Sequence, residues 1–189
     1  MIVENEVFIV SGLPRSGTSL MMQILGAGGI KLAYDDHRPA DQNNPNGYFE
    51  LEKVKTLKQD NSWIVDYKGN ALKVLFHLLE YLPQTLKYKI IFMQRNLDDI
   101  IASQDRMLES YKKPVNQDKD RIKILFKNEL WRTMNWLNKQ KNMQVLNIEL
   151  SDVVKNPLIT LQAIPDFLGR DMDLNAMNTV VNPTLVSKV

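Results

Sequence analysis

A segment near the N-terminus combines the residue types that bind phosphate-like anions. Residues 7–20 read VFIVSGLPRSGTSL, an apolar run followed by two glycines, one cation and three hydroxyl side chains. A strand that leads into such a turn and then into a helix directs backbone N–H groups and the positive end of the helix dipole at one point. Two glycines alone would equally fit a tight turn, but the cation and the hydroxyls supply more donors than a turn requires. We therefore predict an anion site here.

The same segment departs from the loop of nucleotide-hydrolysing enzymes. Gly12 and Gly17 have the spacing of the P-loop motif G-x-x-x-x-G-K-[ST], and Ser19 fills its last position. Thr18 stands where that motif has lysine, and a cation lies inside the loop instead, as Arg15. The pattern predicts a site for an anion other than the β- and γ-phosphates of ATP with their Mg²⁺.

A second basic position follows another apolar run. Residues 90–103 read IIFMQRNLDDIIAS, in which Arg95 comes at the end of an expected strand. Ser103 lies eight residues later, about two helical turns on. An arginine at a strand end is commonly only solvated, but together with this serine it could bind a second phosphate.

Strand and helix patterns alternate along the chain, which favours an α/β fold. We expect strands at 6–11, 71–75, 88–93 and 143–148, and helices at 17–27, 50–61, 97–109 and 118–141. A short helix is expected from 151 and a second one from 157 to about 168. Such alternation predicts three α/β/α layers around a central parallel sheet, with ligands at the carboxyl ends of the strands. The polar stretch at 35–47 is expected to be a loop near that edge. The long helix carries Trp131 and Trp136, whose spacing we interpret as packing.

The amino-acid composition limits the classes of protein to which this chain can belong. The chain has 189 residues, which we take as one domain over 1–189, with 44% hydrophobic and 24% charged residues. A net charge of +2 gives no reason to expect nucleic acid or a membrane surface as partner. There is no cysteine and there are only two histidines, so we expect neither thiol chemistry nor a metal site. We expect no signal peptide and no membrane span, and hence a cytoplasmic protein.

Taken together, these motifs resemble the sulfotransferases that use 3′-phosphoadenosine 5′-phosphosulfate (PAPS). The run VLNIELSDVVKNP at 145–157 and the FLG at 167–169 are similar to the C-terminal pattern of that family. The resemblance implies a P-loop-like fold, PAPS as donor and no metal. It also implies that Arg95 and Ser103 hold the 3′-phosphate. It assigns the 5′-phosphosulfate to Pro14, Arg15, Ser16, Gly17, Thr18 and Ser19.

The resemblance also implies roles in catalysis. Arg15 would stabilise charge on the leaving bisphosphate and on the sulfuryl group, and Lys73 would contact the sulfuryl group. A general base must also take the proton of the acceptor. The histidine that serves in cytosolic members is replaced by Leu75, although His77 lies two residues on.

Two further segments offer candidates for the role of base. Protein-tyrosine sulfotransferases have a similar loop and use a glutamate in the segment that follows it. Here that segment holds Asp35, Asp36 and His37, of which Asp36 is our first choice. Glu50, in the phrase Gly-Tyr-Phe-Glu, is a further candidate.

We thus predict transfer of a sulfuryl group from PAPS to a hydroxyl or amine of a small-molecule, glycan or peptide acceptor. Two alternatives stay open: a module that binds PAPS or its product without catalysis, and a P-loop kinase of nucleotides or small molecules. The chain is short for the family, so the acceptor pocket could be open, or it could be completed by the 35–47 loop or by a second subunit of a homodimer.

Overall fold

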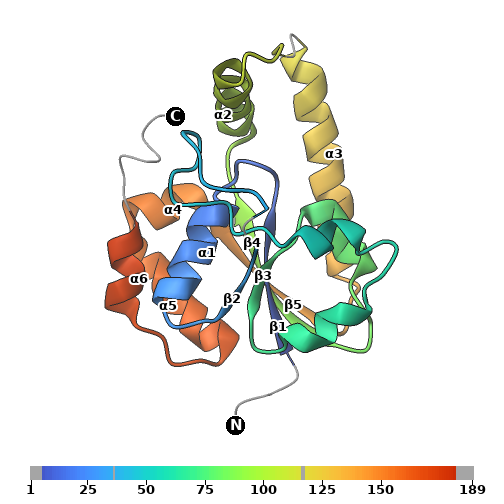
Figure 1. Ribbon diagram of the computed structural model, residues 1–189, viewed down its shortest axis with the longest axis vertical. Helices are drawn as coiled ribbons and strands as arrows, with labels where there is room; N and C mark the ends of the chain where they lie inside the picture. The colour runs from blue at the N-terminus through green and yellow to red at the C-terminus, as the bar shows by residue number, and fades with distance from the viewer. Residues whose placement is uncertain (1–5, 36, 116–117, 182–189) are drawn as a thin grey trace.

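The computed structural model describes residues 6–35, 37–115 and 118–181. Five parallel strands form one sheet in the order β2-β3-β1-β4-β5 (Figure 1). The strands are β1 (Glu6–Gly12), β2 (Leu32–Ala33), β3 (Ala71–Lys73), β4 (Lys87–Gln94) and β5 (Met143–Glu149). The helices are α1 (Thr18–Ala27), α2 (Leu97–Ser110), α3 (Lys119–Leu137), α4 (Leu150–Lys155), α5 (Pro157–Leu168) and α6 (Leu174–Val180). Three 3₁₀ segments lie at Glu52–Thr56, Ser62–Tyr67 and Phe76–Tyr81.

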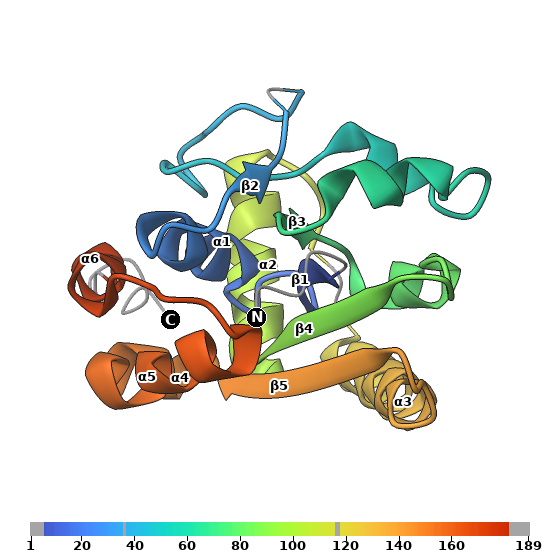
Figure 2. The same cartoon turned by 90° about the horizontal axis from the view of Figure 1, so that it is seen from below.

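The sheet separates two apolar cores, because successive side chains of a strand point to opposite faces. In β1, Val7 and Ile9 pack into one core while Phe8 and Val10 pack into the other, and all four are buried. Helices α1, α4, α5 and α6 cover one face, and α3 with the 3₁₀ segments covers the other (Figure 2). This arrangement confirms the expected three-layer α/β/α fold with a central parallel sheet.

The parallel pairing brings the ends of three strands to one edge. In register, Gly12 of β1 lies opposite Met93 of β4, and Val10 lies opposite Lys73 of β3. The loop after β1, the end of β3 and Arg95 therefore meet at the carboxyl edge of the sheet. Helix α2 and the outer half of α3 stand beyond this edge (Figure 1). Within the described residues, no helix is both long and apolar enough to span a membrane.

Some expected elements differ from the structure. The helix expected at 50–61 is replaced by 3₁₀ turns at Glu52–Thr56 and Ser62–Tyr67. Asp60 accepts hydrogen bonds from the backbone N–H and hydroxyl of Ser62 and starts the second turn. The short strand β2 and helix α6 were not expected. The packing expected of Trp131 was wrong, since its side chain is 70% exposed, whereas Trp136 packs against the core. Five residues along a helix amount to about 140° of rotation, so the two indoles cannot share a face.

A comparison of two glycines tests the close approach of β1 to β4. Gly12 has a φ of 146°, and a Cβ there would lie 2.5 Å from the carbonyl oxygen of Met93. Gly29 also has a positive φ, 96°, but a Cβ there would meet nothing within 4 Å. We expect Gly29→Ala to lower the free energy of unfolding by about 1–2 kcal/mol through backbone strain alone. Gly12→Ala should cost about 1–3 kcal/mol more, because strand β4 must shift.

Urea denaturation of the two variants beside the unmodified protein provides the measurement. Equal stability of Gly12→Ala and Gly29→Ala would show that β1 and β4 do not approach this closely.

Candidate functional site

The loop between β1 and α1 has the backbone of an anion cradle. Gly17, the residue before α1, adopts a left-handed conformation with a φ of 96°, and no side chain caps the first turn of the helix. The first N–H groups of a helix lack partners within the helix, and the dipole adds partial positive charge there. Ser16 is buried, and its hydroxyl donates to the carbonyl of Leu13 at 2.7 Å, which holds the turn. The loop therefore presents an uncapped helix N-terminus at the sheet edge.

Arg15 joins the loop to helix α2. Its φ is 71°, a left-handed conformation that is uncommon outside glycine. Its Nε donates to the hydroxyl of Ser103 at 3.0 Å, and Nη1 contacts the sulfur of Met107 at 3.9 Å. Arg95 donates from Nη1 to the carbonyl oxygen of Arg15 at 2.9 Å. The two motifs, eighty residues apart in sequence, thus meet in one place.

Three guanidinium groups gather here, and none of them forms an ion pair within the described residues. Arg106 lies on α2, three residues after Ser103, and lines the same cavity as Arg15 and Arg95. Burial is the main cause that lowers the pKa of Arg15 and of Arg95, and repulsion from Arg106 lowers both further. Among the described residues, none of these three arginines forms an ion pair, and the buried Nη2 of Arg95 has no hydrogen-bond partner. A buried donor without a partner is costly. The cluster is therefore suited to a multiply charged anion.

Lys73, at the end of β3, contributes a buried ammonium on the other side of the loop. Its Nζ donates to the hydroxyl of Ser19 at 3.1 Å, to the carbonyl oxygen of Tyr48 at 3.0 Å and to Oε1 of Glu50 at 3.2 Å. Burial lowers the pKa of Lys73, and the charge of Glu50 opposes that shift. The lysine thus links the loop to a carboxylate.

Residues 38–50, which we term the strap, complete the site. Arg38 donates from Nη1 to both carboxylate oxygens of Glu50, at 3.0 and 3.2 Å, and its guanidinium carbon lies 3.4 Å from the centroid of the Tyr48 ring. The carboxylate of Asp41 accepts from the hydroxyls of Tyr48 and Tyr111, the latter directly after α2. The strap is therefore fastened both to the end of α2 and, through Glu50, to β3.

A cavity of about 900 Å³ lies between the loop, α2 and the strap. In the described part of the chain it is lined by six cationic side chains and a single carboxylate, that of Glu50. The cations are Arg15, Arg38, Lys55, Lys73, Arg95 and Arg106. A ligand that brings several negative charges would balance this excess.

Most residues predicted from the sequence line this cavity. They are Pro14, Arg15, Gly17, Thr18, Ser19, Lys73, Arg95 and Ser103. Ser16 instead lines a neighbouring cavity of about 440 Å³. His77 is exposed beside Phe76 and is not among the lining residues, so we no longer assign it a catalytic role. Asp36 lies outside the described residues, and its role stays a prediction.

Arg38, Tyr48, Lys55 and Arg106 line the cavity although the sequence did not lead us to expect them there. Arg38 and Tyr48 come from the strap, whose path no local pattern indicates. Arg106 had a usable signal, because a residue three positions after Ser103 shares its helix face. Within the part of the chain that the structure covers, no group of three or more His, Asp and Glu side chains could hold a metal ion.

Replacing Glu50 tests the coupling between the carboxylate and Lys73. In Glu50→Gln, burial of Lys73 remains while the charge that opposes it disappears, so the pKa of Lys73 should fall further. An NMR titration of the lysine amines measures this shift. Glu52→Gln is the matched control, since Glu52 pairs with Lys55 at 2.7 Å and should leave Lys73 unchanged. An unchanged or raised pKa of Lys73 in Glu50→Gln would contradict the coupling.

Solved structures of other proteins share the fold of this chain. Mouse sulfotransferase SULT7A1, solved with PAP, superposes with a TM-score of 0.60 at 18% identity, over 98% of this chain and 68% of that one. Sulfotransferase STF1 of Mycobacterium tuberculosis gives 0.59 at 14% identity, over 100% and 72% of the two chains. The sulfotransferase domain of the Synechococcus olefin synthase gives 0.54 at 19%, over 98% and 80%. These structures show a shared fold.

The comparison with curated proteins found no match. The family model of the sulfotransferase domain, in contrast, matches residues 5–188, nearly the whole chain. The anion cradle, the arginine cluster and this match lead to one conclusion: the chain belongs to the sulfotransferase family.

Proposed function

We propose that this protein transfers a sulfuryl group from PAPS to a hydroxyl or amine of an acceptor. One observation carries the donor assignment. The arginine cluster beside the loop holds a buried guanidinium nitrogen of Arg95 without a partner and has no ion pair among the described residues. A donor with an anionic group at each end of its ribose would satisfy both the uncapped helix and the cluster.

The residues divide between the two ends of the donor. The loop, from Pro14 to Ser19, would hold the 5′-phosphosulfate with its backbone N–H groups and hydroxyls. Arg95 and Ser103 would hold the 3′-phosphate, for which guanidinium donors are well suited. The 3′-phosphate brings about one and a half to two negative charges at neutral pH, and the phosphosulfate brings about two, one on phosphate and one on sulfate. Two such groups match the excess of cations along the cavity.

Charge stabilisation is the main task of these side chains. As the bond between sulfur and the 5′-phosphate oxygen breaks, negative charge grows on that oxygen, and fixed cations lower the barrier. Arg15 and Lys73 lie on either side of the loop and would supply those cations. We assign no step to a metal ion.

A second candidate is a module that binds the nucleotide without transferring the group. It is favoured by the position of His77, because no histidine lines the cavity within the described residues. A P-loop kinase is disfavoured by Thr18 in place of lysine. The acceptor is proposed only by chemical class: a small molecule, glycan or peptide with a free hydroxyl or amine.

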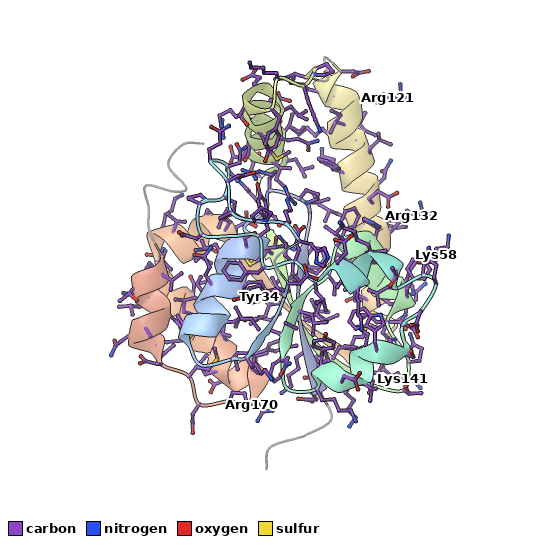
Figure 3. The ribbon with its side chains drawn as sticks, in the orientation of Figure 1. Tyr34, Lys58, Arg121, Arg132, Lys141 and Arg170 are labelled. Carbon is purple, nitrogen blue, oxygen red and sulfur yellow. The ribbon has the colours of Figure 1, made fainter. Side chains whose placement is uncertain are left out.

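Calorimetric titration with 3′-phosphoadenosine 5′-phosphate (PAP) tests the donor site. We expect binding that depends on the 3′-phosphate, and hence much weaker binding of ADP and of Mg²⁺-ATP. Arg15→Ala and Arg95→Ala should each weaken PAP binding at least tenfold, since a hydrogen bond to a charged group contributes about 1.5–3 kcal/mol. The control is Arg121→Ala, an exposed arginine on α3 (Figure 3).

Affinity for PAP that stays unchanged in both cavity variants would overturn the donor assignment. A preference for Mg²⁺-ATP would favour the kinase. Binding of PAP without transfer from PAPS to any acceptor would favour the binding module.

A further inference from the structure

Glu50 differs from every other charged residue of the cavity. It provides the only carboxylate along the lining that the structure describes, among six cations. It lies at the end of the strap, directly before the 3₁₀ segment that starts at Glu52. Its side chain is 28% exposed, so the carboxylate is held by partners and still open to the cavity. The carboxylate of Glu50 opposes binding of an anionic donor, so we look for another role for this residue in the cavity.

The hydrogen bonds of Glu50 leave room for a further proton donor. Oε1 accepts from Lys73 and from Arg38, whereas Oε2 accepts, among the described residues, only from Arg38, at the longer distance of 3.2 Å. An ionised carboxylate has about four acceptor positions. Oε2 can therefore accept a hydrogen bond from a hydroxyl or amine that enters the cavity.

Lys73 places this carboxylate next to the reacting end of the donor site. The same ammonium donates to Glu50 at 3.2 Å and to the hydroxyl of Ser19 at 3.1 Å. Ser19 belongs to the loop that we assign to the phosphosulfate. Glu50 is thus separated from the loop by a single side chain.

We propose that Glu50 is the general base of the transfer, an inference that rests on the proposed function above. The oxygen or nitrogen of the acceptor forms a bond to sulfur while its proton passes to Oε2 of Glu50. The bond between sulfur and the 5′-phosphate oxygen breaks, and its electron pair stays on the phosphate of PAP. Lys73 and Arg38 orient the carboxylate and remain protonated throughout.

Other described carboxylates near the strap are less suited to this role. Asp41 already accepts from two tyrosine hydroxyls and from the backbone N–H groups of Asn43 and Asn44, and it does not line the cavity. Asp35 accepts from the backbone N–H groups of His37 and Glu52, the latter at 2.6 Å. Both carboxylates therefore stabilise the backbone conformation of this part of the chain. Asp36 is the remaining rival, and it can be tested directly.

Three variants distinguish the candidates: Glu50→Gln, Asp36→Asn and the surface control Glu52→Gln. Turnover is measured as PAP released from PAPS, with water alone and with added p-nitrophenol, a simple alcohol, a simple amine and a monosaccharide as probes. We expect Glu50→Gln to lower kcat by about 10²–10⁴-fold, the usual contribution of a general base. Its affinity for PAP should change less than threefold, the surface control Glu52→Gln should keep full turnover, and Asp36→Asn should lower kcat less than Glu50→Gln does.

The pH dependence of the rate shows whether Glu50 acts as the general base or only keeps Lys73 protonated. A base must be ionised, so the rate of the unmodified protein should fall as pH is lowered, and Glu50→Gln should lack this fall. If Glu50 only keeps Lys73 charged, lowering the pH would protonate Lys73 again and restore the activity of Glu50→Gln. Such recovery, full turnover in Glu50→Gln, or a loss confined to Asp36→Asn would each overturn the proposal.

A failure of the proposed function would give other results than a failure of the proposal for Glu50. If the unmodified protein does not bind PAP, the donor assignment fails. If it binds PAP but releases none from PAPS with water or any probe, the protein is a binding module. The proposal that Glu50 is a general base then fails together with the proposed transferase activity.

Discussion

The parallel pairing of β1 between β3 and β4 is the constraint on which the site depends. Parallel strands end at the same edge of a sheet, so three chain segments that are distant in sequence deliver their side chains to one place. The register puts Gly12 against Met93 closely enough that only a hydrogen fits on the glycine Cα. A shift of this register by one residue would move Lys73 and Arg95 away from the loop and turn their side chains to the opposite faces.

The cationic side chains of the cavity differ in whether they form ion pairs with other described residues. Arg38 and Lys73 share Glu50, whereas Arg15, Arg95 and Arg106 have no ion pair among the described residues. Repulsion between the unpaired guanidinium groups lowers the stability of the free protein and is relieved when an anion arrives. The fold bears this cost because the buried strands beneath the loop supply most of the stabilisation. The site is thus electrostatically prepared before any ligand binds.

The parts of the site that depend on short stretches of sequence could be predicted, whereas the parts that depend on contacts between distant residues could not. The loop from Gly12 to Ser19 and the pair Arg95 and Ser103 are local patterns, and the strands on which they depend are uninterrupted apolar runs, so the α/β fold and the position of the site could be predicted. Arg38 and Tyr48 join the cavity through the strap, whose course is set by hydrogen bonds to Tyr111 and Lys73 far away in sequence. Such contacts leave no periodic signal in the chain. The two-residue strand β2 is also too short for any pattern, and 3₁₀ turns form where a helix was expected at 50–61.

Tyr48 shows how closely the two sides of the cavity are joined. Its hydroxyl bonds to Asp41, its ring stacks on Arg38, and its carbonyl oxygen accepts from Lys73 and, at 3.4 Å, from the hydroxyl of Ser19. The strap and the loop at the two sides of the cavity therefore share one residue. If the cavity holds donor and acceptor as proposed, a change of the strap that admits a different acceptor would also disturb the cations around the donor. The two specificities could then not be changed independently of each other.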